Sequence, residues 1–473
     1  MTAALVLVAA GTASVAGTQP GPAGVKAPLA ASVSPELAAG GPIRHVVVVF
    51  QENHSFDNVL GAFCVQKARC DGTETGVLAP SAPGGSPTPY PLVRSPDVVP
   101  FVGHRPPDQE LAVDGGRMDG WSRIPGCSAS SSPPYGCLTQ YQPGQVPNLV
   151  GLATQYALSD RTFEPAVSAS WGSHLELASS TLDGFTGANP DAPRDDWGCG
   201  SRATARWRAS PGSAVLQVPS CVPNRDGSGA FEPTPVRWVP TIMDRLDAAG
   251  LSWRIYAPGR GQSGYGWSIC PSFADCLGSG QSANQVPDSQ FASDAIAGRL
   301  PSLSVVVPMA GQSQHNRFSM ALGDNWIGAV VNAVATGPDW SSTAVFITYD
   351  DCGCFYDHVP PPPGEGVRVP MVIVSPWAKP GFTDSTPASF DSLLAFCEHV
   401  FGLAPLSSAD AGAYDYAASF NLPTSQPALA ASTEGAHFGP DVVGRPAPPV
   451  VQELARGEAR RLEAQRPDPE DPT

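Results

Sequence analysis

The chain has 473 residues, and its 27 Lys and Arg stand against 43 Asp and Glu, which gives a formal net charge of −16 at pH 7. This balance excludes a nucleic-acid-binding protein held by a basic face, because polyphosphate partners require clustered Lys and Arg. Hydrophobic residues make up 42% of the chain and charged residues 15%, which excludes global disorder and allows a large core.

The first apolar run, at residues 3–16, predicts a secretory signal peptide. The run is too short to span a bilayer and ends in Ser14-Val15-Ala16, a pattern that a signal peptidase could cut. No Lys or Arg precedes it, the first being Lys26, and a frayed Ala-rich terminus is the alternative. We expect a signal peptide over 1–16, a flexible Ala-, Pro- and Gly-rich spacer over 17–42, and a secreted protein.

Apolar runs and helical patterns alternate along the rest of the chain. Continuous β-branched runs are typical of strands buried on both faces of a parallel sheet. The alternation indicates an α/β fold, a three-layer α/β/α sandwich with a mostly parallel central sheet. Ligand sites in such sheets lie at the carboxyl ends of the strands, so we expect the chemistry just after each apolar run. Strands are expected at 45–50, 304–307, 344–349 and 371–374, helices at 241–250, 326–335 and 389–400, and Pro/Gly-rich insertions at 73–100 and 186–235.

Most of the eleven cysteines fall into local couples. The couples lack the flanking Cys and His residues of a zinc site, so small loop-closing disulfides in an oxidising compartment are the better account. A further couple, Cys352 and Cys354, would close a strained ring, and Cys397 is a rival partner for either thiol. The four expected disulfides are Cys64–Cys70, Cys127–Cys137, Cys199–Cys221 and Cys270–Cys276.

Two clusters of oxygen-bearing side chains follow predicted strands. Glu52 and Asn53 come after the first strand, and Asp350 and Asp351 come directly after the third. Carboxylate and amide oxygens are hard ligands that suit Mg²⁺, Ca²⁺ or Mn²⁺. Adjacent carboxylates repel each other unless a cation holds them, which favours a metal site. Helix capping and hydrogen bonding within loops are the alternative.

Several long segments resemble, in the same order, the bacterial phosphoesterases that include the non-hemolytic type of phospholipase C and related acid phosphatases. The resemblance runs from Ile43 to about Leu403 and implies an alkaline-phosphatase-like fold, with a catalytic domain over 43–425 and a C-terminal tail over 426–473. The chain after Leu403 is too short for the β modules of the long phospholipases of this family, which favours the smaller subtypes. The segments that carry the resemblance are 45–63, 115–121, 241–257, 315–334, 343–362 and 368–381.

The resemblance also implies a ligand set and a nucleophile. The metal ligands carried over are Glu52, Asn53, Asp350, Asp351 and a hydroxyl nucleophile in the segment 169–174, which points to Ser170. Coordination to a cation is one way to turn a serine hydroxyl into an alkoxide. The segment departs from the family pattern in three places, so two other serines are rivals for the role of nucleophile. Ala169 and Gly172 stand where Pro is usual, Ser173 replaces Asn, and the rivals are Ser168 and Ser173.

Phosphoryl transfer also needs donors to the phosphate oxygens and an acid for the leaving alcohol. His104 and His315 match histidine positions of the family and are the candidates, although an isolated His is more often structural. His358 follows Asp357 and precedes a Pro run, so we expect it to support other site residues or to pack, and not to act in catalysis. A further helix at 175–178 is expected to aim its amides at the phosphate, and the segment 266–271 offers no additional histidine.

The function expected from the resemblance is a secreted, metal-dependent phosphoric ester hydrolase with a serine nucleophile. Phospholipase C-like cleavage of a phosphodiester or phospholipid is the first choice, and an acid phosphatase acting on monoesters is the alternative. A non-catalytic surface binding protein on the same scaffold is a second alternative. We expect at most transient contact with a membrane surface, where Trp121, Trp197 and Trp207 could form an apolar approach unless they are packing anchors. The identity of the metal, the head group and the oligomeric state are left open.

Overall fold

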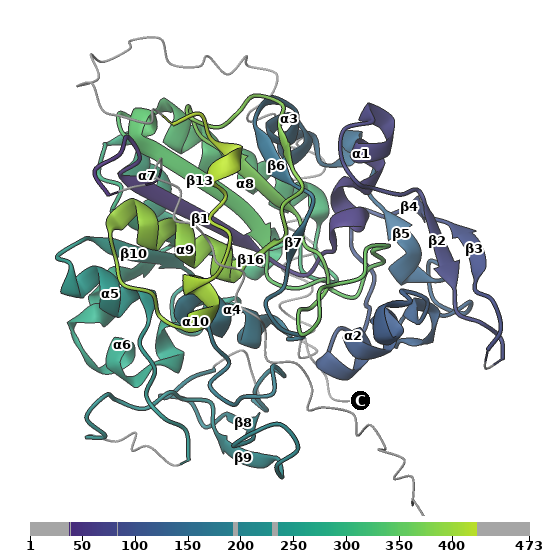
Figure 1. Cartoon of the computed structure of the whole chain (residues 1–473), viewed down its shortest axis with the longest axis horizontal. Coiled ribbons are helices and arrows are strands. Elements are labelled where there is room, and N and C mark those ends of the chain that lie inside the picture. The colour runs from purple at the N-terminus through teal and green to yellow at the C-terminus, as the bar shows by residue number, and fades with distance from the viewer. Residues whose placement is uncertain (1–36, 38, 83, 193–196, 229–234, 423–473) are drawn as a thin grey trace, which may run out of the picture.

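The computed structural model describes residues 37, 39–82, 84–192, 197–228 and 235–422 (Figure 1). The expected signal peptide over 1–16, most of the spacer over 17–42 and the tail over 426–473 lie outside these residues. Within the described segments, no helix has both the length and the apolar character needed to cross a lipid bilayer.

An eight-stranded sheet forms the centre of the fold, and its strands lie in the order β11-β10-β12-β1-β13-β14-β6-β15 (Figure 1). Neighbouring strands are parallel except where β14 pairs with β13 and with β6. The expected α/β class with a mostly parallel central sheet is therefore confirmed. The strands are β1 His45–Gln51, β6 Ala157–Ser159, β10 Trp253–Ala257, β11 Gln285–Pro287, β12 Leu303–Val306, β13 Thr343–Tyr349, β14 Met371–Val374 and β15 Thr383–Asp384.

The strand β1 lies between β12 and β13 and is parallel to both. Its Val46 pairs with Leu303 on one side and with Ala344 on the other. Residues 46–51 are all buried, since helices cover both faces of the sheet. This position explains why β1 reads as an unbroken apolar run and not as an alternation of apolar and polar residues.

One strand runs against the expected direction. Val345 of β13 pairs with Val374 of β14 and Thr348 pairs with Met371, so the two strands are antiparallel. The described segment 350–370 contains no helix, and a chain that returns without a crossover helix pairs antiparallel. The carboxyl end of β14 therefore lies at the opposite edge of the sheet, and the expectation of chemistry after every apolar run is wrong for 371–374.

Helices pack against the sheet in two groups, one on each face (Figure 1). One group contains α3, α7 and α8, and the other contains α4, α5, α9 and α10. This completes the expected three-layer arrangement. The helices are α1 Ala62–Lys67, α2 Pro106–Val113, α3 Pro147–Gln155, α4 Ser170–Ser179, α5 Ile242–Ala248, α6 Ala274–Gly278, α7 Gln290–Ile296, α8 Met320–Thr336, α9 Phe390–Phe401 and α10 Ser408–Ala411.

The three predicted helices are present, with shifted ends. The helix α5 begins after Thr241, whose side chain accepts the backbone N–H of Asp244. The helix α8 begins at Met320, earlier than the expected 326, because Ser319 caps it. The helix α9 ends at Phe401 and is followed by its C-cap residue, Gly402, which adopts the left-handed conformation with φ 67°.

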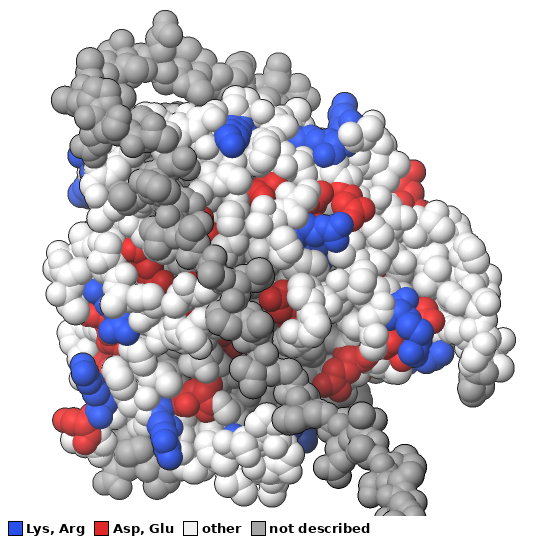
Figure 2. Space-filling view, viewed as in Figure 1, with Lys and Arg blue, Asp and Glu red and all other residues white. Residues whose placement is uncertain are grey.

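The Pro/Gly-rich segments form small hairpins outside the central sheet. Residues 75–93 contain no charged side chain, and the β2–β3 hairpin in this stretch is uncharged in the space-filling view (Figures 1 and 2). Residues 186–235 contain the hairpin of β8 and β9. The smaller strands are β2 Thr75–Leu78, β3 Thr88–Pro91, β4 Val93–Arg94, β5 Thr139–Gln140, β7 Thr162–Phe163, β8 Thr204–Trp207, β9 Leu216–Pro219 and β16 Ala388–Ser389.

The four expected disulfides are all present, linking Cys64 to Cys70, Cys127 to Cys137, Cys199 to Cys221 and Cys270 to Cys276. Three cysteines are buried free thiols, namely Cys352, Cys354 and Cys397. The sulfur atoms of Cys352 and Cys354 lie 3.8 Å apart, so this couple is close but not bonded.

Reduction of the disulfides is expected to lower the melting temperature. In the chain-entropy account each bridge contributes on the order of 2–4 kcal/mol, so loss of all four should lower Tm by roughly 5 °C or more. Calorimetry of the purified protein with and without a phosphine reductant measures this shift. Alkylation without reductant, which reaches only free thiols, is the control. Mass spectrometry that finds free thiols at the bridged positions would contradict the pairing.

Candidate active site

The two oxygen-bearing clusters meet at one edge of the sheet. Gln51, the last residue of β1, pairs with Tyr349, the last residue of β13, so the residues that follow each strand are neighbours. The backbone N–H of Asp350 donates to the carbonyl of Gln51 at 2.9 Å, and that of Asn53 donates to Asp350 Oδ1 at 2.8 Å. The side chains of Glu52, Asn53, Asp350 and Asp351 are fully buried.

Ser170 joins this cluster from the helix α4. Its Oγ donates to Glu52 Oε2 at 3.0 Å, and the side chain is fully buried. The hydroxyls of the rival serines, Ser168 and Ser173, instead hydrogen bond each other at 2.8 Å. Of the three serines, Ser170 is therefore the one whose hydroxyl contacts the carboxylate cluster.

The helix α4 begins at Ser170 and not at 175, so the expected start was wrong. An insertion loop holds this first turn: Gly187 O accepts the N–H of Ala169 at 2.8 Å, and Asn189 Oδ1 accepts that of Trp171 at 2.8 Å. A Cβ at Gly172 would lie 2.7 Å from Cβ of Ser168 and 3.0 Å from Cα of Gly187. This close approach explains a glycine where the family usually has proline.

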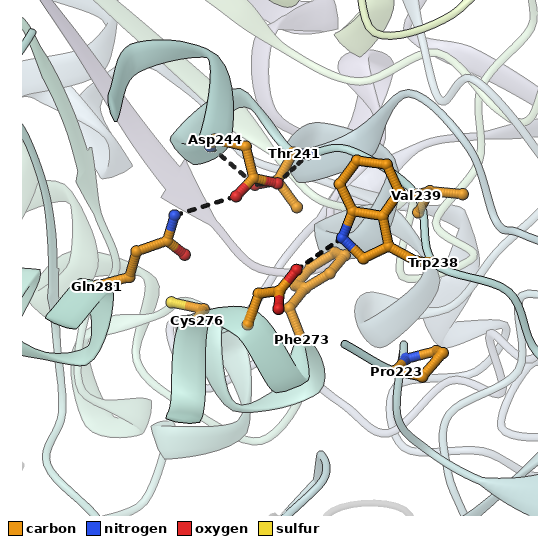
Figure 3. Close-up of a pocket in the computed structure, with 9 residues that line it drawn as sticks. Pro223, Trp238, Val239, Thr241, Asp244, Phe273, Cys276 and Gln281 are labelled. Carbon is orange, nitrogen blue, oxygen red and sulfur yellow. Dashed lines mark hydrogen bonds between the residues drawn. The ribbon is translucent and has the colours of Figure 1, made fainter. Parts of the chain in front are cut away.

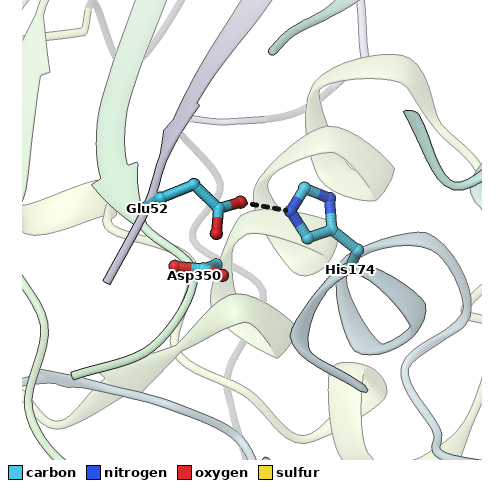
Figure 4. A group of neighbouring side chains, drawn as sticks. All are labelled: Glu52, His174 and Asp350. Atoms are coloured by element: carbon cyan, nitrogen blue, oxygen red, sulfur yellow. Dashed lines mark hydrogen bonds and ion pairs between the residues drawn. The ribbon is translucent and has the colours of Figure 1, made fainter. Parts of the chain in front are cut away.

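His174 is a site residue that the sequence analysis missed. Its Nε2 lies 3.2 Å from Glu52 Oε1 (Figure 4). Ligand-bearing atoms of Glu52, His174 and Asp350 all lie within 4.8 Å of one another. Residues four apart share one face of a helix, so the spacing of Ser170 and His174 would have found it if the helix start had been known.

The electrostatics of the cluster favour a cation. Burial raises the pKa of Glu52 well above its usual value, and the neighbouring charge of Asp350 raises it further. Burial also raises the pKa of Asp350. Two buried oxygens, Asn53 Oδ1 and Asp350 Oδ2, have no hydrogen-bond partner among the described residues. These are hard donors, so the residues present fit a divalent metal ion.

The two candidate histidines lie together. The ring centroids of His104 and His315 are 5.6 Å apart, and Trp267 stacks on His315 at 5.9 Å. Nδ1 of His104 contacts the carbonyl of Val102 at 2.9 Å, which leaves Nε2 for other partners. Burial lowers the pKa of His315 to about 3 and also lowers that of His104, although the charge of Asp350 opposes the shift of His104. The influence of Asp350 places His104 within electrostatic reach of the cluster.

A second group of potential metal ligands consists of Asp57, Asp357 and His358. An arginine side chain contacts both carboxylates of this group. Arg368 is fully buried and contacts Asp57 Oδ1 and Asp357 Oδ1, each at 3.2 Å. Burial alone would lower the pKa of His358, but the hydrogen bond to Asp57 and the charges of Asp57 and Asp357 together outweigh burial and raise this pKa. The guanidinium balances both carboxylates, so the group is a packing network. The packing role expected for His358 agrees with this arrangement.

A narrow surface pocket lies away from these residues, beside α5 and α6 (Figure 3). Its polar side chains bond each other: Trp238 Nε1 donates to Asp275 Oδ2 at 2.7 Å, and Gln281 Nε2 donates to Asp244 Oδ1 at 3.0 Å. None of the expected site residues lines it. The lining residues are Pro223, Trp238, Val239, Thr241, Asp244, Phe273, Asp275, Cys276 and Gln281.

Comparisons with known proteins agree with the resemblance seen in the sequence. The chain is 24% identical over 453 residues to the non-hemolytic phospholipase C of Pseudomonas aeruginosa, with 81% of this chain and 58% of that protein covered. It is 26% identical over 378 residues to phospholipase C A of Mycobacterium tuberculosis, with 71% and 64% covered. The chain thus spans about three fifths of the length of these relatives.

Among solved structures, a protein in the alkaline phosphatase superfamily from Vibrio parahaemolyticus aligns with a TM-score of 0.38 at 11% identity, over 80% of this chain and 70% of that one. Residues 43–404 of this chain match the Phosphoesterase family. Because this match covers most of the chain, the protein belongs to the Phosphoesterase family.

Proposed function

We propose that this protein is a metal-dependent phosphoric ester hydrolase of phospholipase C type, with Ser170 as its nucleophile. The observation that carries the proposal is the hydrogen bond from Ser170 Oγ to Glu52 Oε2, inside a buried cluster whose other members are oxygen donors. A serine placed only for packing would not require buried carboxylates and an unpartnered Asp350 oxygen beside it. Membership of the Phosphoesterase family supports the reaction class.

A divalent cation bound by Glu52, Asn53, Asp350 and Asp351 would supply positive charge that favours the alkoxide form of Ser170 and the developing charge on the phosphate. Glu52 Oε2 already holds the hydroxyl proton of Ser170 in a hydrogen bond, so it orients Oγ for attack on phosphorus. The attack forms the bond from Oγ to phosphorus and breaks the bond from phosphorus to the leaving alcohol, while the hydroxyl proton passes to Glu52. Water then releases the phosphoryl group from Ser170, and in the case of a diester this group still carries its head group.

The leaving alcohol needs a proton, and His104 or His315 would give it. Both rings are buried, and burial favours their neutral form. An anionic phosphate ester beside these rings would raise both pKa values, so binding of the substrate would favour protonation of the histidine that serves as the acid. His104 is the better placed of the two, because the charge of Asp350 already acts in the same direction.

A diester or phospholipid substrate is favoured over a monoester because the relatives are named phospholipases C. The expected aromatic approach through Trp121, Trp197 and Trp207 is not the route, because all three side chains are buried. Val98 and Phe101 are apolar side chains that are each 40% exposed. Four disulfides support secretion into an oxidising compartment.

A substrate panel tests the proposal. We expect the purified protein to cleave nitrophenyl phosphocholine at least tenfold faster than nitrophenyl phosphate, and to lose both activities in a chelator. Faster turnover of the monoester at acidic pH, with an inert diester, would replace this proposal by the acid phosphatase alternative. If no ester is turned over in the presence of divalent metals, the remaining alternative is a non-catalytic binding protein.

A further inference from the structure

His174 is a buried histidine whose ring nitrogen faces a carboxylate of the proposed metal site. The side chain is 2% exposed, and its Nε2 faces Glu52 Oε1 at 3.2 Å. Burial lowers the pKa of the ring, and hydrogen bonding to the backbone of Trp267 opposes this shift. A neutral imidazole has one N–H and so can donate to only one of these two acceptors. If the proton is on the Trp267 side, a bare nitrogen lone pair faces the carboxylate of Glu52.

A lone pair and a carboxylate facing each other are stable when a cation lies between them. Two ligand atoms at 2.0–2.2 Å from one ion are separated by roughly 3–4 Å, and the 3.2 Å between His174 and Glu52 falls in this range. Asp350 completes the group, with Oδ2 buried and without a hydrogen-bond partner among the described residues. A ring N–H on a backbone carbonyl is also the usual arrangement of a histidine that binds metal.

We propose that His174 is a nitrogen ligand of the metal ion held by Glu52 and Asp350, and that it makes this site select Mn²⁺, Fe²⁺ or Zn²⁺ over Ca²⁺ and Mg²⁺. The inference rests on the metal centre of the proposed function and narrows its metal class. Imidazole nitrogen is a ligand for borderline transition metals, whereas Ca²⁺ and Mg²⁺ take oxygen ligands almost exclusively. With oxygen ligands alone, the selection between these metals would depend only on the size of the ion and its coordination geometry.

Electron spin echo spectroscopy of the Mn²⁺-loaded full chain tests the assignment directly. The protein is stripped with chelator and reloaded with one equivalent of Mn²⁺, and coupling to a directly bonded ¹⁴N nucleus is recorded. We expect this coupling in the wild type, its loss in His174→Gln, and its retention in His45→Gln. His45 is a matched control because it lies at the opposite end of the strand that leads to Glu52, where its Nδ1 contacts the carbonyl of Pro301.

Metal competition gives a second readout that does not depend on activity. We expect the wild type to bind Mn²⁺ or Zn²⁺ at least 100-fold more tightly than Ca²⁺, and His174→Gln to reduce that ratio by about tenfold or more. If His174→Gln binds too little Mn²⁺ for spectroscopy, His174→Asp introduces an anionic oxygen ligand in place of the imidazole. Loading of that variant without the nitrogen signal would support the assignment.

A wild type that binds Mn²⁺ without nitrogen coupling overturns the inference, as does a signal that survives in either His174 variant. His174 would then be a hydrogen-bond donor that positions Glu52, and the proposed hydrolase would stand. A protein that binds no divalent metal and cleaves phosphodiesters in chelator would instead remove the metal centre of the proposed function. The two failures are therefore distinguishable.

Discussion

Ser170→Ala is expected to lower kcat/KM for a phosphodiester by roughly three orders of magnitude or more, while the fold and the metal content are retained. The variant removes the attacking oxygen of a covalent mechanism and leaves only the contribution of the electrostatic environment. Loss of a small buried hydroxyl frees Glu52 Oε2 but removes no anionic ligand. Initial rates, metal analysis and circular dichroism of the variant measure these three quantities.

Ser173→Ala is the matched control for this experiment. Ser173 lies in the same helix and is equally buried, but its hydroxyl bonds Ser168 and not the carboxylate cluster. We expect its rate to stay within about threefold of the wild type, with at most a modest loss of stability. Acid-quenched turnover followed by peptide mapping should find the phosphoryl group, still esterified to its head group, on Ser170 of the wild type. Phosphate on Ser168 or Ser173 would contradict the assignment.

Asp350→Asn is expected to abolish turnover and metal binding and yet to raise the melting temperature of the metal-free protein. Asn keeps an Oδ1 that accepts the backbone N–H groups of Asn53 and Asp351, so the loop conformation survives. Burial raises the pKa of Asp350, which means that the ionised carboxylate is less stable in the folded protein than in the unfolded chain. At pH 7, above the usual pKa, removing that charge therefore stabilises the metal-free fold.

The same substitution at Asp357 should change the melting temperature in the opposite direction. Asp357 is also a buried carboxylate, but it contacts Arg368 at 3.2 Å and shares that guanidinium with Asp57. Burial also raises the pKa of Asp357, to about 6, but Asp357→Asn leaves the buried guanidinium with one carboxylate, and this loss outweighs the relief of burying a charge. We therefore expect a lower Tm with unchanged metal content. Calorimetry in chelator and metal analysis after reloading compare the two variants. Full metal content in Asp350→Asn, or a lower Tm for its metal-free form, would contradict the proposed centre.

Several features of this protein follow from local sequence. The run at 45–50 predicts a central strand because β-branched residues on both faces require burial on both faces, and β1 lies between two parallel neighbours. The four bridged cysteine pairs are predictable because the loops they close are short, with separations of 6 to 22 residues. The meeting of Glu52 and Asp350 follows from the alignment of parallel strand ends at one edge of the sheet.

Other features depend on contacts between segments that are distant in the sequence. The direction of β14 is decided by its pairing with β13 and β6, and an apolar run of four residues carries no sign of its direction. The burial of Trp121 and the free thiols of Cys352 and Cys354 are likewise products of packing. Composition alone does not distinguish a buried loop residue from an exposed one.

The role of His174 is the clearest case in which the tertiary structure decides. Its position depends on where α4 begins, and that start is held by Gly187 and Asn189 of an insertion loop. Its contact with Glu52 depends on how α4 packs against the end of β1, 122 residues away in the chain. The sequence by itself determined the strands, the short disulfides and the carboxylates at the strand ends, because these depend on neighbouring residues. Only the folded chain distinguished Ser170 from its rivals Ser168 and Ser173 and placed His174 on those carboxylates, because both depend on how a helix packs against the sheet.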